Sequence, residues 1–327
     1  MMHVLGMLAS IALTALCWGL YGPVLHFGRE SMHSAMRPFV CVGLAYFLIA
    51  VLIPLALLRR GERGTWTIQG ALWSLLAGTA GALGALGVIL ALFFGGKPIY
   101  VMPLVFGGAP VVNTLLTAFM NRAFNQLKAP FLAGLILVVT GAVTVLVFKP
   151  QPQPPAVAAA AAGVAAGAER FVEVLVAVAM AMVSWGAYGP VLHRGQAAMG
   201  GSRLRPLVCI GAAYFLIAVL VPLGLLVPLG DAGTWSLRGG LWSMGAGALG
   251  ALGALGTILA FACGGKPFTV MPVVFGCAPV INTLATLAFA HTPVGAVSPW
   301  FLAGMLVVAV GAATVLVFGP RGHVPRA

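Results

Sequence analysis

Residues 37–55, "RPFVCVGLAYFLIAVLIPL", carry one charge, at their first position, and are otherwise uncharged and mostly apolar. A helix that crosses a bilayer needs about 20 predominantly apolar residues, so this stretch predicts a transmembrane span. The chain writes nearly the same stretch again at residues 205–223, "RPLVCIGAAYFLIAVLVPL". The sequence therefore predicts a membrane helix that occurs twice.

Two more pairs of matching segments lie in the same order in the two halves of the chain. "WGLYGPVLH" at 18–26 matches "WGAYGPVLH" at 185–193, and "GGKPIYVMPLVFGGAPVVNTL" at 95–115 matches "GGKPFTVMPVVFGCAPVINTL" at 264–284. Self-similarity at a fixed offset indicates an internal repeat. We interpret the chain as a duplicated unit.

The composition places the whole chain in a membrane. Hydrophobic residues make up 61% of the 327 residues and charged residues only 7%, far from the mix of a soluble domain. The five cysteines all lie in apolar runs without a CxxC pair, so we expect reduced, buried thiols. Ten apolar runs have the length of a span: residues 4–27, 37–58, 71–95, 98–120, 130–148, 171–194, 205–229, 240–263, 267–290 and 300–318.

Five spans per unit give the second unit the opposite orientation to the first. The sequence therefore predicts an all-α polytopic membrane protein with ten transmembrane helices in two inverted five-helix repeats. Of the 17 Lys and Arg residues, 11 fall on the side of both termini, so by the positive-inside rule we expect the termini to face the cytoplasm of a plasma membrane or bacterial inner membrane. The expected parts are a first repeat at 1–148, a Pro/Ala-rich linker at 149–169, a second repeat at 170–319 and a cytoplasmic tail at 320–327.

Prolines recur at matching positions of four spans and predict interrupted helices. A proline inside a helix leaves a carbonyl without its partner, which a membrane tolerates only where protein or a wet cavity satisfies it. We expect these four helices to line a cavity near the midplane, as in transporters built from inverted repeats. For any one proline, a kink that serves packing alone is an equal alternative. The hinge candidates are Pro23, Pro103, Pro110, Pro190, Pro272 and Pro279.

Polar and aromatic residues inside the spans are candidates for the wall of that cavity. An amide at this depth bonds either another part of the protein or a solute. The aromatic side chains either wall the cavity or fill the core, and tyrosine hydroxyls near the midplane need partners. The candidates are Asn113, Asn282, Trp18, Trp185, Tyr21, Tyr188, Tyr46 and Tyr214.

Four basic residues at span ends are gate candidates: His26, His193, Lys97 and Lys266. Inversion puts the two histidines on opposite sides of the membrane, and neither has a second ligand nearby, so we expect no metal site. We interpret each histidine as an interfacial cap or a gating hydrogen bond. Each lysine stands in "GGKP" at a helix start, where it either anchors the chain at the headgroups or offers positive charge to an anionic solute.

Acidic residues are absent from the middle of every predicted span, and Glu30, Glu62 and Asp231 fall in loops or at span ends. Proton-driven carriers of organic cations usually keep a membrane carboxylate, so this class is disfavoured. The sequence has no GxSxG, HExxH or P-loop motif, and we expect neither an enzyme nor a cofactor. The basic residues are scattered between apolar runs, which argues against a nucleic-acid partner.

The fourth span of each half, "PLVFGGAPVVNTLL" and "PVVFGCAPVINTLA", resembles that of the drug/metabolite transporter superfamily, close to its EamA-like members. The fifth spans, "FLAGLILVVTGAVTVLVF" and "FLAGMLVVAVGAATVLVF", and the "WG" of the first span fit the same resemblance, which covers about residues 5–318. It implies a solute carrier with cytoplasmic termini and a central cavity formed by helices one, three, four, six, eight and nine. Carriers of amino acids, sugars, nucleotide sugars and phosphorylated metabolites belong to the superfamily.

The sequence thus predicts a secondary transporter that moves a small polar solute, neutral or anionic, by alternating access, with membrane lipids around it. The oligomeric state stays open. The alternative is a non-transporting membrane scaffold or a lipid-handling protein, because the glycine-rich runs at 78–87 and 247–256 offer flat surfaces to other helices. Transport predicts that water-soluble reagents reach Asn113 and Asn282, whereas a scaffold predicts that both are sealed.

Overall fold

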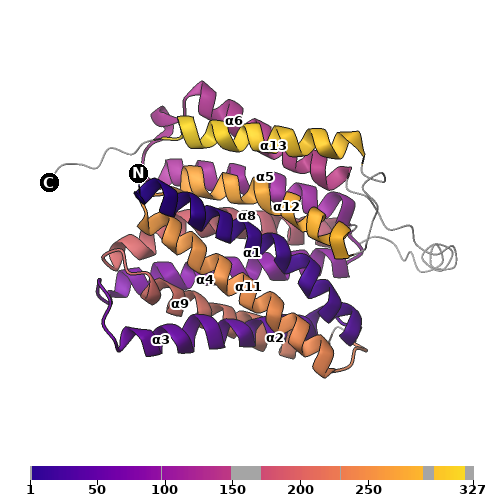
Figure 1. The fold of residues 1–327 in the computed structure, drawn as a ribbon. Helices are drawn as coiled ribbons and strands as arrows, with labels where there is room; N and C mark the ends of the chain where they lie inside the picture. The colour runs from indigo at the N-terminus through magenta and orange to yellow at the C-terminus, as the bar shows by residue number, and fades with distance from the viewer. Residues whose placement is uncertain (1, 97, 149–170, 229, 290–297, 321–327) are drawn as a thin grey trace.

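The computed structural model describes residues 2–96, 98–148, 171–228, 230–289 and 298–320, and within these ranges the chain is a bundle of helices without a strand (Figure 1). Nine helices in the described ranges are long and apolar enough to cross a membrane. The chain is therefore an integral, polytopic membrane protein, as the sequence predicted.

The first half folds into six α-helices. Its second span is a composite in which two α-helices flank a π-helical turn at Phe47–Leu52. The described apolar part of the fourth span is the shorter segment Leu104–Met120. The helices are α1 (Met2–Met32), α2 (Met36–Tyr46), α3 (Ile53–Leu58), α4 (Ile68–Phe93), α5 (Pro98–Met120) and α6 (Ala129–Val147).

The second half repeats this order, again with a π-helical turn, at Leu216–Leu220, inside its second span. Helices α4 and α11 start alike, because the side chains of Thr67 and Ser236 accept hydrogen bonds from the amides of Gly70 and Gly239. The helices are α8 (Phe171–Ala198), α9 (Leu204–Phe215), α10 (Val221–Leu225), α11 (Leu237–Ala262), α12 (Pro267–Phe289) and α13 (Pro299–Phe318).

The sequence predicted helices that are interrupted at the prolines shared by the two repeats. For the described residues this prediction is wrong. Helix α1 continues through Pro23, α8 through Pro190, and α12 through Pro272 and Pro279. Helix α5 likewise runs unbroken past its two internal prolines. A proline removes one backbone donor, and tight packing by neighbouring helices holds the rest of the helix together around the loss.

The departure from α-helical geometry lies instead in the second span of each half. The π-helical turns run to Leu52 and Leu220, two residues before Pro54 and Pro222. A proline ring clashes with the carbonyl four residues earlier, and a widened turn relieves that clash. Both π-helical turns lie in the repeated "FLIAVL", at matching places of the two halves.

Each half packs its first span mainly against the third span of the other half. Helix α1 runs along α11 and α8 runs along α4, with glycines at both contacts. A methyl group on Gly253 would clash with the indole of Trp18, and one on Gly84 with that of Trp185. The glycine-rich runs thus let an aromatic helix of the other half approach closely, so the two halves are interleaved.

Equivalent helices of the two halves also touch, and they run in opposite directions. Along α6 and α13, Gly134 lies against Thr314 and Gly141 lies against Val308. Helices α2 and α9 meet where the rings of Tyr46 and Tyr214 stack, with centres 3.8 Å apart and planes 3° apart. Figure 1 shows these pairs side by side at opposite edges of the bundle.

Two acidic loop residues each bind the start of a helix in the other half of the chain. Asp231 lies 3.1 Å from Arg37 Nε and accepts a hydrogen bond from Ser34, before α2. Glu62 accepts hydrogen bonds from the Arg203 and Leu204 amides, at 2.6 and 3.2 Å, before α9. These contacts position the loops that precede α11 and α4 and connect the two halves.

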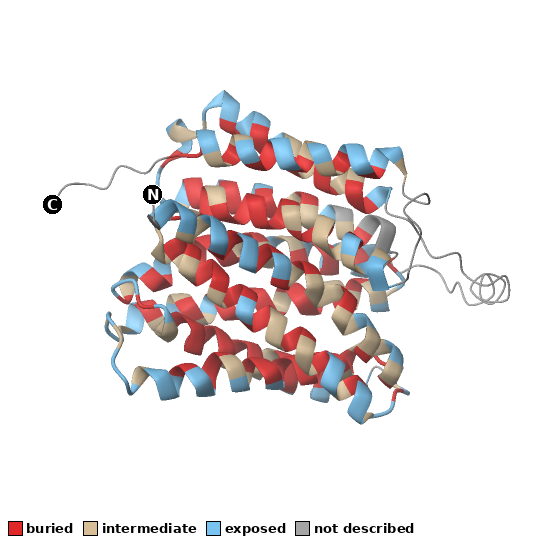
Figure 2. Ribbon diagram, viewed as in Figure 1, coloured by how far each residue is buried: buried red, intermediate tan, exposed pale blue. Residues whose placement is uncertain are grey.

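Burial follows the packing between helices. Figure 2 shows buried residues on the faces that helices turn to one another and exposed residues on the outward faces. Many exposed side chains are large and apolar, among them Leu48, Leu52 and Ile53 on the second span. Exposed apolar side chains on span-length helices face the hydrocarbon of a bilayer.

Candidate functional site

Four tyrosines from four helices gather in the interior. Tyr21 on α1 and its repeat equivalent Tyr188 on α8 lie within electrostatic range of the hydroxyl group of Tyr46 on α2, as does Tyr214 on α9. Tyr46, Tyr188 and Tyr214 are 4 to 6% exposed. We call these four residues the tyrosine centre. It is where the first two helices of both halves converge.

The repeated tryptophans frame the tyrosine centre and are held by the backbone. The indole of Trp18 donates a hydrogen bond to the Gly250 carbonyl at 3.2 Å, and that of Trp185 donates to the Gly81 carbonyl at 3.1 Å. The ring of Trp18 also meets Tyr188 edge to face at 5.7 Å. Both indole donors are therefore used by the protein itself.

Two hydroxyls of the tyrosine centre lack a partner. Within the described residues, the buried hydroxyl oxygens of Tyr21 and Tyr188 make no hydrogen bond. Leaving a buried polar group unpaired costs about 1–3 kcal/mol, and a bound solute or water removes that cost. A phenol hydroxyl can both donate and accept, so the pair suits the oxygen atoms of a polar solute.

Arg29 lies about two turns after Tyr21 on α1 and adds positive charge near the end of that helix. Its side chain is half-buried, and no described carboxylate lies within ion-pair distance of it. The described ranges also hold no group of three His, Cys, Asp or Glu residues that could bind a metal ion. The arrangement therefore favours neutral or anionic groups over cations.

The two asparagines lie beside the repeated Gly-Pro pairs. Asn113 on α5 is fully buried, and its Nδ2 donates to the Pro267 carbonyl at 2.9 Å, while its Oδ1 has no described partner. That oxygen faces Gly189, and Asn282 Nδ2 on α12 lies against Gly22 in the same way. The sequence left open whether this amide bonds another part of the protein or a solute. The Asn113 nitrogen bonds another helix.

The hinge candidates lie around these asparagines. Pro23 and Pro190 are buried next to the glycines that the asparagines contact, and Pro110 is buried on α5 one turn before Asn113. Pro272 and Pro279 are buried inside α12. The side chain of Pro103 lies outside the described residues. The structure thus collects the described prolines on α1, α5, α8 and α12, the four helices predicted from the sequence.

The repeated histidines lie in different surroundings. The side chain of His26 is 65% exposed, and its Nε2 lies 3.2 Å from a carboxylate oxygen of Glu30. His193 is half-buried, with its ring edge-on to Phe261 of α11 at 5.1 Å and with Lys266 nearby. Lys97 lies outside the described residues. His26 is thus uncovered where α1 ends, and His193 is covered where α8 ends.

A second pair of equivalent residues differs in the same way. Gln196 on α8 is 3% exposed, and its Nε2 donates to the Ile258 carbonyl of α11 at 3.0 Å. Arg29 holds the matching position on α1, and within the described residues it makes no hydrogen bond to α4. Helix α8 touches both α11 and α12, whereas α1 makes no contact of comparable extent with described residues of α4 or α5.

The bundle therefore has two unlike ends. We call the end where α8 finishes and α1 begins, at the left of Figure 1, the α8 end, and the opposite one the α1 end. Gln196 and His193 close the α8 end against α11. Arg29 and Gln196 were missed in the sequence, although aligning "HFGRE" with "HRGQA" places them in register and shows that the repeat differs there.

Comparison with known proteins supports the fold and no more. No protein-family model and no curated protein matches the sequence. A solved crystal structure of a protein is similar over 98% of this chain and 99% of the other, with a TM-score of 0.64 and 20% sequence identity. At this identity the likeness shows that the fold, over nearly its full length, also occurs in an experimental structure.

Proposed function

We propose that this protein is a secondary transporter that moves a small polar metabolite, neutral or anionic, across the membrane by alternating access. The observation that carries the proposal is the unlike pair of ends. Equivalent residues are in contact at the α8 end, through Gln196 and Ile258, and apart at the α1 end, where Arg29 has no hydrogen bond to a described residue of α4. Two alternative packings of matched helices are what alternating access requires.

The proposal includes ten spans in two inverted repeats of the drug/metabolite transporter type, with both termini in the cytoplasm. The opposite directions of α6 and α13 and of α2 and α9 support the inversion. The bias of Lys and Arg toward one side supports the orientation, with the α8 end in the cytoplasm. In that frame the described conformation is closed to the cytoplasm.

The transport cycle exchanges the roles of the two halves. In the opposite state, Arg29 and His26 on α1 pack toward α4, and Gln196 and His193 on α8 release α11. The Gly-Pro pairs at Pro23 and Pro190 serve as hinges, because a helix without one backbone hydrogen bond bends there at lower cost. The tyrosine centre lies between the ends and is the proposed solute site.

The chemistry of this centre sets the solute class. Tyr21 and Tyr188 offer unpaired hydroxyls, and Arg29 offers a cation nearer the α1 end. A carboxylate, phosphate or hydroxylated solute satisfies both kinds of group. An organic cation meets no described carboxylate there, so cations are the excluded class.

The test is thermal stabilisation of the purified protein by panels of amino acids, sugars, phosphorylated metabolites and organic cations. A ligand that binds the folded state raises the melting temperature by mass action. We expect a neutral or anionic hit whose shift is lost in Tyr188→Phe and retained in Thr140→Val, which removes an exposed hydroxyl on α6. A hit confined to cations contradicts the proposed solute class, and no hit favours the scaffold or lipid-handling alternative.

A further inference from the structure

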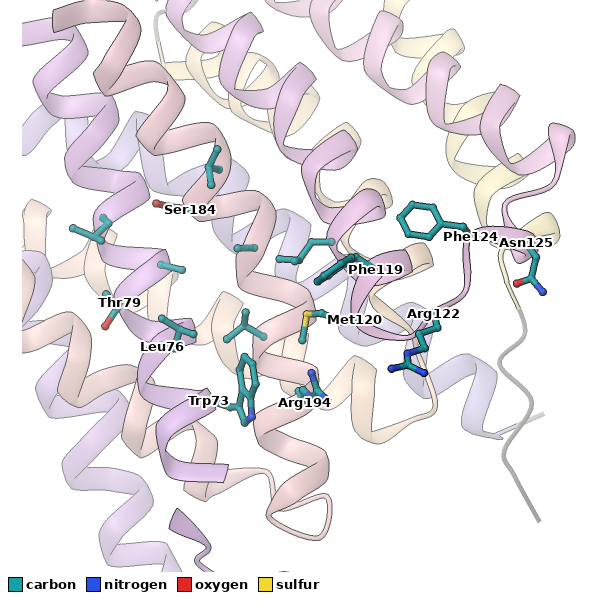
Figure 3. Close-up of a pocket in the computed structure, with 16 residues that line it drawn as sticks. Trp73, Leu76, Thr79, Phe119, Met120, Arg122, Phe124, Asn125, Ser184 and Arg194 are labelled. Carbon is teal, nitrogen blue, oxygen red and sulfur yellow. The ribbon is translucent and has the colours of Figure 1, made fainter. Parts of the chain in front are cut away.

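A long groove runs along the outer side of α8. Its floor is α8, and its walls are α4 and α5, which both pack against α8 and touch each other little. Its volume is about 1110 Å³, above the range of about 300–1,000 Å³ typical of small-molecule pockets. Figure 3 shows the lining side chains, with Ser184 on the floor and Leu76 and Phe119 on opposite walls.

The groove opens toward the surroundings of the bundle. Its walls and floor carry exposed apolar side chains, with Phe119 at 71%, Val183 at 51% and Leu76 at 49% exposure. In a membrane protein such a surface contacts lipid acyl chains. The groove is therefore separate from the tyrosine centre, whose residues are not among its lining.

One end of the groove is basic. Arg194 and Arg122 both line it, at the α8 end, and Figure 3 shows them below Phe119 and Met120. The Arg194 guanidinium lies 5.1 Å from the ring centre of Trp73, which fixes the cation over an aromatic face. Neither arginine has a described carboxylate within ion-pair distance.

Arg122 lies in the turn that follows α5, beside the groove. Its φ is +50°, in the left-handed region where glycine avoids the steric cost that an L-residue bears. Hydrogen bonds from the Arg122 amide to Phe119 O and from the Ala123 amide to Ala118 O hold this turn after α5. Arg122 thus places a positive charge next to the groove.

The matching groove on α1 differs. Phe27 replaces Arg194 there, and its ring packs on Trp242 at 4.9 Å and on Phe289 at 5.6 Å. That groove has a volume of about 590 Å³, and its Arg238 matches Gln69 of the first half, while the segment that matches Arg122 lies outside the described residues. The two grooves therefore differ at the position of Arg194, where α1 carries Phe27 in a stack of aromatic rings.

We propose that the groove on α8 binds an anionic phospholipid, with its phosphate at Arg122 and Arg194 and an acyl chain along the apolar part of the groove. Two exposed guanidinium groups at one end of the groove suit a phosphate, and the apolar walls suit a chain that lies parallel to α8. In the proposed orientation the basic end faces the cytoplasmic leaflet, where anionic lipids concentrate. A lipid seated on α8 contacts the helix that closes the α8 end.

The experiment titrates detergent-purified protein with phosphatidylglycerol or with phosphatidylcholine of the same acyl chains and follows the melting temperature. We expect phosphatidylglycerol to stabilise the protein more strongly, and Arg122→Gln with Arg194→Gln to weaken its apparent affinity at least tenfold. Arg203→Gln is the matched control, because Arg203 is exposed at the same end and lies outside the groove lining. Inorganic phosphate alone should give no shift.

A second measurement locates the lipid. Phosphatidylglycerol with brominated acyl chains should quench the fluorescence of wild-type protein more than that of Trp73→Phe, since Trp73 lines the groove. The proposal is overturned by equal stabilisation by the two lipids, or by a full phosphatidylglycerol response in the double arginine variant. Equal quenching of the wild-type protein and of Trp73→Phe also overturns the assignment to this groove.

Discussion

The side-chain amide of Gln196 on α8 donates a hydrogen bond to the backbone carbonyl of Ile258 on α11, at 3.0 Å. The bond joins the first helix of the second half to the third helix of the same half, across the interior of the bundle. Its counterpart in the first half would join Arg29 to Ile89, and among the described residues no such bond exists. Together with the unlike surroundings of His26 and His193, this difference distinguishes the α8 end from the α1 end.

Removing the Gln196 bond should open the α8 end. A buried hydrogen bond contributes about 0.5–1.5 kcal/mol, so Gln196→Ala should shift the balance between the two conformations about two- to tenfold. Labelling of a cysteine introduced at the buried Ala254, one turn deeper along α11 than Ile258, measures the shift. Gln196→Met keeps the length and loses the donor, so it should behave like Gln196→Ala; unchanged labelling in both variants contradicts a gating role.

The two hinge prolines should act in opposite directions. Pro23→Ala restores a backbone donor in α1, and Pro190→Ala restores one in α8, so each variant stiffens one of two matched helices. We expect the variants to favour different open states. Cysteine accessibility measured separately from the two faces of reconstituted vesicles reports the bias. The hinge assignment fails if both variants show the same pattern.

Close packing between the halves predicts a large effect of a small change. Gly253→Ala places a methyl group against the Trp18 indole and should lower stability by about 1–3 kcal/mol. Gly245→Ala is the control on the same helix, because its methyl group would meet Val24 at 3.8 Å, an ordinary contact. Thermal unfolding in detergent should show a lower melting temperature for the first variant only.

The ion pair between Asp231 and Arg37 predicts that the stability of the protein depends on pH. Burial alone would raise the pKa of this carboxyl, but hydrogen bonds from Ser34, the Gly233 amide and Arg37 outweigh it and lower the pKa below its usual value of 3.8. A lowered pKa means that the contribution to stability is present above about pH 4 and is lost as the pH falls through the folded-state value.

Asp231→Asn should therefore lower the melting temperature at neutral pH, by the equivalent of about 1–3 kcal/mol. The difference from wild type should shrink below pH 4, as the wild-type carboxyl takes up its proton. Glu173→Gln is the control, since Glu173 is an exposed residue in the first turn of α8. A difference that stays constant from pH 7 to pH 3 rules out the ion pair as its source.

Hydropathy and the repeat predicted the span-length helices, because burial in a bilayer leaves a long apolar signature in each segment. The prolines misled the prediction of interruptions, since whether a helix continues through Pro23 depends on what packs around it. The π-helical turns precede Pro54 and Pro222, whereas α1 and α8 pass their prolines without such a turn, so a proline alone does not predict one.

The contacts between segments far apart in the chain could not be predicted from local sequence. Asp231 meets Arg37 across 194 residues, and Gln196 meets Ile258 across 62, so neither pair is visible before the helices are placed. The tyrosine centre was partly predicted, because its members were named individually, but their convergence required the interleaving of α1 with α11. Arg29 was missed because a basic residue near a span end is usually an interfacial anchor.

The most direct test uses single cysteines at His26 and His193, the last residues of the repeated phrase, in a background without the five native cysteines. The account predicts that a membrane-impermeant thiol reagent labels the His26 variant from the side of the α1 end and leaves the His193 variant protected. A transported solute should reverse this pattern. Equal labelling of both variants, or a pattern that no stabilising solute changes, would contradict alternating access.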